Sequence, residues 1–326
     1  MSADASESPL GGSGSPLLIL AGPTASGKTA LALSLAEQFQ GEVVSCDSVA
    51  VYRGMEIGTA KPSMEERMRV PHHLIDVFSP DEVCTAGDYS RLAREAIRSI
   101  TGRGRLPIVA GGTGLYLRAL IEGLFPAPAR REPLRTKLRA RAERHGPPYL
   151  HRILKRVDPA AAELVHANDV PKVIRAIEIT LAGQEGIAPM TEQWRQPRDP
   201  LTGYRILRLG LNPPRAELYA RINRRAAQMF DSGLVEETTQ LVETYGFECR
   251  PLTSLGYAQA IAVLRGETTL DQAVAECAQG HRNYAKRQLT WFRKDPEIRW
   301  LEAFGSSDES QAEARALVSS FLAQPS

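Results

Sequence analysis

The chain has 326 residues, of which 43% are hydrophobic, 24% charged and 6% aromatic, with a formal net charge of +2. This composition is typical of a globular protein, and the absence of any apolar run near the about 20 residues that span a bilayer argues against a membrane protein. The cysteines Cys46, Cys84, Cys249 and Cys277 lie far apart. Their spacing fits neither a zinc site nor a disulfide framework, and it suits a reducing cytoplasm.

The first predicted element is a tail. Residues 1–16 are small, polar and acidic, and they lack the basic start and apolar centre of a secretory signal, so we predict disorder there. Apolar runs at 16–22, 41–48, 105–116 and 204–211 predict strands, and a helix is predicted after Thr29. Strand–loop–helix units of this kind indicate an α/β fold with a parallel sheet and helices on both faces. After residue 212 the chain is predicted to be helical to its end.

A segment of different amino-acid composition interrupts this pattern. Residues 130–199 hold few strand-like runs and are rich in Arg, Ala, Glu and Leu, with prolines at both borders. Residues 130–156 contain ten Lys or Arg and only two acidic residues. We therefore predict a helical insertion domain with a basic face, set between two halves of a catalytic core at 17–129 and 200–326. A solvated basic face without a partner is the plainer alternative.

GPTASGKT at residues 22–29 matches the phosphate-binding pattern GxxxxGK[ST], between a predicted strand and a predicted helix. In such a loop backbone N–H groups surround phosphate oxygens, the lysine adds a positive charge, and the final hydroxyl can bind Mg²⁺. The loop predicts a P-loop kinase-like fold with Thr29 as metal ligand. The expected diphosphate-binding residues are Gly22, Pro23, Thr24, Ala25, Ser26, Gly27, Lys28 and Thr29.

A carboxylate is predicted to face this loop. P-loop triphosphatases hold their Mg²⁺ with an aspartate at the end of a strand, but the run at 105–116 ends in glycines. Asp47 follows the run at 41–48 instead, and the ends of parallel strands share one crevice, which brings Asp47, Ser48 and Thr113 near the loop. Asp47 is therefore expected to act as a general base or a water-mediated magnesium ligand. The alternative is that it only caps a turn.

Five segments together resemble one family. They are GPTASGKT, DSVAVYRGMEIGTAKP (47–62), PHHLIDV (71–77), GGTGLYLRAL (111–120) and KRQLTWFRK (286–294). In this order they are similar to the bacterial-type tRNA dimethylallyltransferases, over residues 17–300. The resemblance implies transfer of a dimethylallyl group from dimethylallyl diphosphate to the exocyclic amino group of the adenosine 3′ of the anticodon. The substrates would be tRNAs that read codons starting with U, and Mg²⁺ would assist.

The resemblance also implies roles for individual residues. Asp47 matches the family's catalytic base, with Thr113, Lys28 and Arg225 completing the expected catalytic set, and Arg221 and Arg225 lie near the diphosphate. The insertion domain would grip the anticodon stem-loop of tRNA. Expected tRNA contacts are Asp47, Ser48, Val49, Ala50, Thr113, Arg135, Pro171, Lys172, Val173, Ile174, Arg175, Ser254, Gly256, Tyr257, Lys286, Arg287, Gln288 and Arg293.

Some positions depart from the family pattern. Ala50, the pair Pro171-Lys172 and Ala258 differ from the residues usual in the family, all on the expected RNA side. Trp291 and Phe292 are expected to pack in the core. The chain is expected to be a monomer in the cytoplasm. Three other functions remain open at this point: a small-molecule P-loop kinase, a non-catalytic RNA-binding protein, and an adenylate isopentenyltransferase acting on free nucleotides.

Overall fold

The computed structural model describes residues 14–124, 128, 130–183 and 199–324. The chain divides into two compact units, one formed by Met1–Ile121 with Leu201–Ser326 and the other by Glu122–Pro200. The second unit thus begins before residue 130, where the sequence suggested the border of the insertion. We call these the core unit and the inserted unit.

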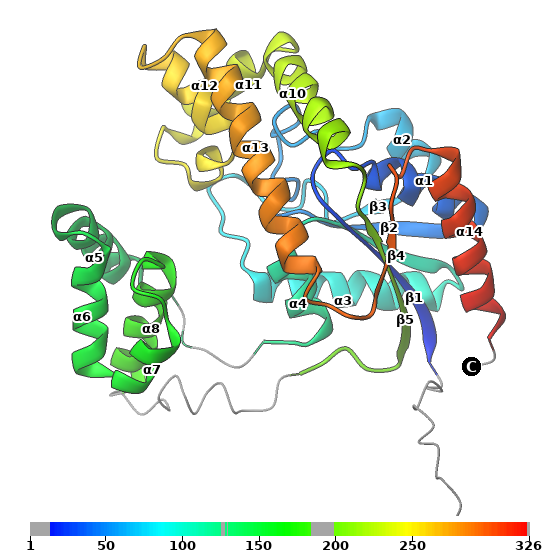
Figure 1. The fold of residues 1–326 in the computed structure, drawn as a ribbon, viewed down its shortest axis with the longest axis horizontal. Coiled ribbons are helices and arrows are strands. Elements are labelled where there is room, and N and C mark those ends of the chain that lie inside the picture. Colours follow the sequence, from blue (N-terminus) through cyan, green and yellow to red (C-terminus); the bar gives the residue numbers. More distant parts are fainter. Residues whose placement is uncertain (1–13, 125–127, 129, 184–198, 325–326) are drawn as a thin grey trace, which may run out of the picture. The chain divides into compact units, whose positions relative to one another are not determined.

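The core unit is built on a parallel sheet of six strands in the order β3-β2-β4-β1-β5-β6 (Figure 1). This confirms the predicted α/β fold. The strands are β1 (Ser15–Ala21), β2 (Gly41–Cys46), β3 (His72–His73), β4 (Leu106–Gly111), β5 (Tyr204–Leu211) and β6 (Ile298–Leu301). β1 lies between β4 and β5, with Leu18 in register with Ile108 on one side and Leu207 on the other.

Three details of the sequence-based assignment were wrong. The predicted tail overlaps strand β1, because Ser15 and Pro16 already pair with Tyr204 and Arg205; residues 1–13 lie outside the described part. β3 and β6 were not predicted. Both are short strands at the two edges of the sheet, and β6 interrupts the region after residue 212 that was expected to be wholly helical. Runs of two and four residues give too little alternation to be recognised.

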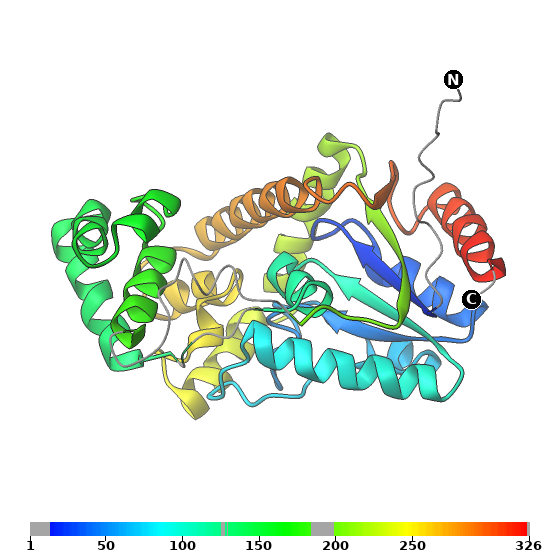
Figure 2. The same ribbon diagram turned by 90° about the horizontal axis from the view of Figure 1, so that it is seen from below.

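Alternate residues of β1 face two different cores, as the period of a strand requires. Leu18 and Leu20 belong to a cluster with residues of helices α1 (Lys28–Gln38) and α14 (Asp308–Ala323). Leu17 and Ile19 belong to a larger cluster on the other face, which includes residues of α3 (Ala86–Gly102), α4 (Gly114–Ile121) and α13 (Leu270–Phe292). Figure 2 shows α3 running beneath the sheet. Both faces are therefore covered by helices.

The remaining helices complete the two units. In the core unit they are α2 (Met64–Arg69), α10 (Arg215–Asp231), α11 (Leu234–Tyr245), the 3₁₀ helix η1 (Arg250–Thr253) and α12 (Tyr257–Leu264). The described part of the inserted unit contains α5 (Glu132–His145), α6 (Pro147–Val157), α7 (Pro159–Leu164) and α8 (Val170–Gly183). These four helices have a core of their own, whose members include Leu138, Leu150, Leu154, Val173 and Ile177.

Candidate functional site

The phosphate loop joins the end of β1 to the start of α1. Gly27 precedes the helix with φ 90°, a left-handed conformation that glycine adopts without strain. A Cβ atom there would lie 3.0 Å from the backbone nitrogens of Gly305 and Ser306, so close packing also demands glycine. The Gly305 N–H donates to the Ser26 carbonyl at 2.9 Å. The segment after β6 thus packs against the phosphate loop and supports it.

Lys28 and Ser26 are two polar side chains of this loop with little access to solvent. The Lys28 amine donates to the carbonyls of Gly22 and Pro23, at 3.0 and 2.6 Å, so it lies across the loop. Burial, together with the nearby positive charge of Arg225, lowers the pKa of Lys28 to about 8. Ser26 is fully buried, and its hydroxyl has no hydrogen-bond partner among the described residues. Of the two, Lys28 lines the main cavity, where it can meet an anionic ligand, whereas Ser26 does not line it.

Gln288 on α13 ties the phosphate loop to the glycine segment after β4. Its Oε1 atom accepts from the Thr24 N–H at 2.8 Å, and its Nε2 atom donates to the Gly112 carbonyl at 2.9 Å. The side chain is 5% exposed. A Cβ atom on Gly112 would lie 2.0 Å from that Nε2 atom, so this position must be glycine. Gln288 therefore positions two loops, and its predicted tRNA contact stays a prediction.

Asp47 directly follows β2, as predicted. Its Oδ1 atom accepts from the N–H groups of Val49 and Ala50 at 2.8 and 3.1 Å, which is the turn cap considered as the alternative role. Asp47 also lines the main cavity, so the cap and an active-site position coexist. The Thr113 hydroxyl accepts from the Ser48 N–H at 3.1 Å. The ends of β2 and β4 are joined in this way, and Asp47 is fixed in orientation.

This cavity has a volume of about 660 Å³, within the usual range for small-ligand sites. Asp47 and the phosphate loop both contribute to its wall, together with basic and polar side chains of the core unit. Its lining includes Thr24, Lys28, Thr29, Asp47, Ala50, Lys61, Arg221, Arg224, Arg225, Tyr284 and Gln288. The cavity thus combines two carboxylates, Asp47 and Glu66, with a larger number of Lys and Arg side chains, which suits an anionic group beside a group that loses a proton.

The two predicted arginines of α10 reach the cavity. Arg225 donates to the Thr24 hydroxyl at 3.5 Å and to the Thr59 carbonyl at 3.3 Å, while its buried Nε atom has no partner among the described residues. Burial lowers the pKa of its guanidinium. Arg221 donates to the Ser306 hydroxyl at 3.3 Å, and its guanidinium lies 5.0 Å from the centre of the Phe304 ring.

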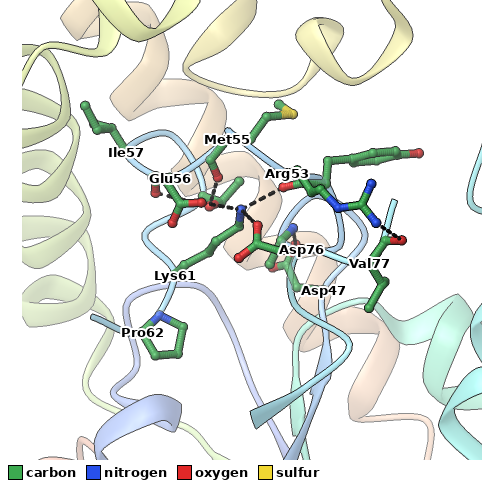
Figure 3. A network of polar contacts seen from close by, with 12 residues as sticks. Asp47, Arg53, Met55, Glu56, Ile57, Lys61, Pro62, Asp76 and Val77 are labelled. Carbon is green, nitrogen blue, oxygen red and sulfur yellow. Dashed lines mark hydrogen bonds and ion pairs between the residues drawn. The ribbon is translucent and has the colours of Figure 1, made fainter. Parts of the chain in front are cut away.

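Lys61 anchors the segment between Asp47 and Pro62, as Figure 3 shows. Its side chain is 1% exposed, and the amine donates to the carboxylates of Asp76 and Glu56 at 2.5 and 2.9 Å and to the Tyr52 carbonyl at 2.7 Å. Arg67 adds a second ion pair to Asp76 at 2.7 Å. Burial alone would raise the pKa of Asp76, but the bonds from Lys61 and Arg67 lower it. The loop that begins with Asp47 is therefore rigidly held.

Sequence reasoning missed Lys61, Arg224 and Tyr284 as cavity residues. Lys61 stands inside the block DSVAVYRGMEIGTAKP, so its place in that block was an available signal. Tyr284 lies on α13, and no local pattern links it to Asp47. The pKa of Tyr284 is raised to about 12 by burial and by the charge of Asp47, although a hydrogen bond with Thr113 opposes this. Its hydroxyl therefore stays protonated beside Asp47.

Several predicted tRNA contacts were wrong for the side chains concerned. Val173 and Ile174 are 0% and 2% exposed in the core of the inserted unit, and Tyr257 is 0% exposed with its hydroxyl donating to Glu237 at 2.6 Å. Arg135 forms two 2.8 Å hydrogen bonds to Glu178, with its own side chain 12% exposed and that of Glu178 1%. These residues stabilise the fold and are not available to a ligand.

The other predicted contacts keep accessible side chains in most cases. Pro171, Lys172, Lys286, Arg287 and Arg293 are exposed, Ser48, Val49, Arg175 and Ser254 are half-buried, and Ala50 and Gly256 are buried. Arg175 donates to Glu178 and to the Pro128 carbonyl, so it too has partners within its unit. Of the two residues expected in the core, Phe292 is 3% exposed and confirmed, whereas Trp291 is 41% exposed.

Metal-binding possibilities are limited in the part of the chain that the structure describes. No group of three or more His, Cys, Asp or Glu could hold a metal ion there, and all four cysteines are free and buried. Thr29 is exposed at the first turn of α1 and lines the cavity. A magnesium ion that takes most of its ligands from a diphosphate and water needs only one or two protein oxygens. Thr29 and Asp47 fit that requirement.

Comparison with known proteins decides the family. The profile described as IPP transferase matches residues 50–295. The chain belongs to the IPP transferase family. Among the relatives of this IPP transferase, the tRNA dimethylallyltransferase of Koribacter versatilis is 60% identical over 93% of this chain and 97% of its own. That of Solibacter usitatus is 51% identical over 95% of this chain and 100% of its own.

Solved structures agree with this assignment to the IPP transferases. The full-length tRNA isopentenylpyrophosphate transferase from Bacillus halodurans has a TM-score of 0.68 and 38% identity, covering 94% of this chain and 96% of its own. A eukaryotic dimethylallyltransferase acting on tRNA has a TM-score of 0.76 and 25% identity, covering 96% and 80%. Among the helices of this IPP transferase that the structure describes, none has the length and apolar character needed to cross a membrane.

Proposed function

We propose that this protein transfers a dimethylallyl group from dimethylallyl diphosphate to the exocyclic amino group of the adenosine 3′ of the anticodon. The substrates are tRNAs that read codons starting with U, and diphosphate is released. The observation that carries the proposal is a single cavity in which Asp47 shares the wall with the phosphate loop. Membership of the IPP transferase family and the names of its relatives support it.

The basic side chains of the cavity serve the leaving group. The allylic C–O bond breaks and its electron pair departs with the diphosphate, which becomes more negative. Lys28, Arg221 and Arg225 stand around the loop to stabilise that charge, assisted by the backbone N–H groups at the start of α1. The Thr29 hydroxyl would hold a magnesium ion in this proposal, and the bound ion would neutralise further diphosphate charge.

Asp47 serves the attacking group. As the adenine nitrogen forms its bond to the prenyl carbon, one proton must leave that nitrogen, and the Asp47 carboxylate receives it. The turn hydrogen bonds to Oδ1 fix the carboxylate, and within the described part of the chain Oδ2 has no hydrogen bond or ion pair. The Tyr284 hydroxyl, protonated and next to Asp47 and Thr113, helps to orient the incoming base.

Exposed basic residues on the inserted unit suit the anticodon stem-loop as partner. On α5 the side chains of Lys137, Arg139, Arg141 and Arg144 are all exposed. Phosphate contacts of this kind make affinity fall as salt rises. A base within the loop must be flipped out to reach a cavity, and single-stranded loops allow this at modest cost. The protein acts in the cytoplasm as a monomer in this proposal.

The test supplies labelled dimethylallyl diphosphate and Mg²⁺ with unmodified tRNA, or with AMP in its place. Label on tRNA is expected, and label on AMP alone would assign the protein to free nucleotides. Asp47→Asn keeps the turn cap through its amide oxygen and removes the base, so we expect a fall of about 10²–10⁴-fold in the chemical step with tRNA binding intact. Turnover near wild type in this variant would exclude Asp47 as the base.

A further inference from the structure

One face of α13 connects the cavity to the surface. Tyr284, Arg287 and Trp291 are spaced i, i+3 and i+7, which places them on the same side of the helix (α13, orange in Figure 1). Tyr284 lines the cavity, and Arg287 is exposed with its guanidinium 5.7 Å from the Tyr284 ring centre. Trp291 lies about 10 Å from Tyr284 along the helix axis, because it is seven residues further on and each residue rises about 1.5 Å.

The indole of Trp291 lies on the turn that carries Thr113. A Cβ atom on Gly114 would lie 2.4 Å from both Cδ1 and Nε1 of Trp291, so the ring sits directly on the Gly114 backbone. Gly114 begins α4, immediately after Thr113. The ring nevertheless stays 41% exposed, and Leu115 beside it is 49% exposed. A large aromatic surface therefore stands next to the residues that orient Asp47.

Two exposed cations share the side of the helix that carries this ring. They are Arg287 and Lys294, at i−4 and i+3 from Trp291, whereas Lys286 and Arg293 are exposed on other sides. Arg293 also donates to the Asn212 side chain at 3.2 Å. Protein–protein interfaces deplete charged residues, lysine above all, around their aromatic centres. Sites for single-stranded nucleic acid combine aromatic rings with a positively charged path. The composition of this surface favours RNA over a protein partner.

We propose that Trp291 stacks on an unpaired base of the anticodon loop next to the flipped adenosine. This rests on the proposed function and adds a positioning residue for its RNA substrate. When the target base enters the cavity beside Tyr284, its neighbours in the strand stay at the rim with their faces exposed. The indole offers one of them a flat apolar surface, and Arg287 and Lys294 reach the adjoining phosphates. Trp291 acts on the binding of RNA and takes no part in the transfer step.

The experiment measures prenylation of an anticodon stem-loop RNA by wild type, Trp291→Ala and Trp291→Phe. Phe247→Ala is the matched control, because Phe247 is 42% exposed in the same unit and faces Arg265. Loss of one base–aromatic stack should raise the KM for RNA about tenfold in Trp291→Ala and leave kcat and the KM for dimethylallyl diphosphate within about twofold. Trp291→Phe should retain most of the affinity, and Phe247→Ala should match wild type.

A second arm replaces each nucleotide flanking the target adenosine by an abasic one. For the wild-type protein, the KM for one of these abasic RNAs should be about tenfold higher than for the intact RNA. For Trp291→Ala, the abasic and intact RNAs should have the same KM, because the same stack cannot be lost twice. The proposal would be overturned if Trp291→Ala left the KM for RNA unchanged, or if the effects of the variant and of the abasic nucleotide on KM were additive. It would also be overturned if the wild-type protein self-associated and Trp291→Ala abolished that self-association. Failure of wild type to label the stem-loop at all would instead refute the proposed function.

Discussion

The hydrogen bonds of Gln288 make a quantitative prediction. Gln288→Met keeps the size of the side chain and removes both polar atoms, leaving the Thr24 N–H and the Gly112 carbonyl without their partner. Leaving one buried polar group unsatisfied costs about 1–3 kcal/mol. The hydrogen bond to Gly112 is buried and the one to Thr24 is partly buried, so we expect the free energy of unfolding to fall by about 2–4 kcal/mol. For a unit of this size, that corresponds to a fall in Tm of about 4–16 °C.

The functional effect should fall mainly on the donor site. Because Thr24 lies in the phosphate loop, its release should raise the KM for dimethylallyl diphosphate more than the KM for RNA. Gln279→Met is the control: Gln279 is an exposed residue of the same helix, bonded only to side chains on that helix. Thermal unfolding and steady-state kinetics measure both effects. A Gln288→Met protein with wild-type Tm and donor KM would refute the idea that this amide organises the two loops.

Two further predictions follow from charge. The lowered pKa of Lys28, about 8, means that the folded protein releases this proton while the unfolded chain keeps it up to about 10.5, so stability should rise with pH between these values. Affinity for diphosphate, measured by calorimetry, should fall above pH 8, and Lys28→Arg should lack that inflection, because its guanidinium keeps the charge. Glu178→Ala strips a buried partner from Arg135 and should destabilise the inserted unit by about 3–5 kcal/mol, whereas Glu163→Ala, at an exposed site, should not. Limited proteolysis within residues 122–200 measures this, and equal cleavage of the two variants would contradict the structural role of the pair.

Local pattern was enough to predict the central strands and the phosphate loop. Buried strands of six or seven residues give continuous apolar runs, as in β1 and β4, and GPTASGKT fixes its own surroundings. Strand-end reasoning also brought Asp47 and Thr113 together correctly, because the ends of parallel strands share an edge whatever the sequence between them.

Residue orientation was the part that pattern could not supply. Val173 and Ile174 were expected to contact tRNA from the resemblance alone, yet their side chains are buried in the inserted unit, while Pro171 and Lys172 are exposed. Tyr284 and Trp291 share a face of α13, yet Tyr284 lines the cavity and Trp291, which was expected in the core, is 41% exposed. The contacts of Tyr284 with Thr113 and of Trp291 with Gly114 join residues more than 170 positions apart and arise only when the chain has folded.

The inserted unit leaves the core unit after Ile121 and the chain returns at Leu201, where the Leu201 N–H donates to the Ile121 carbonyl at 2.8 Å. The two ends of the excursion are thus clasped together by the backbone of the core unit itself. Replacing residues 122–200 by a short turn should disturb the sheet little, because β4 and β5 each pair with β1 and no residue of the inserted unit takes part in that pairing. This segment can therefore change in length or be exchanged as one piece without rebuilding the sheet, and in the proposed function the site at Asp47 and the tRNA-binding surface of the inserted unit can vary independently.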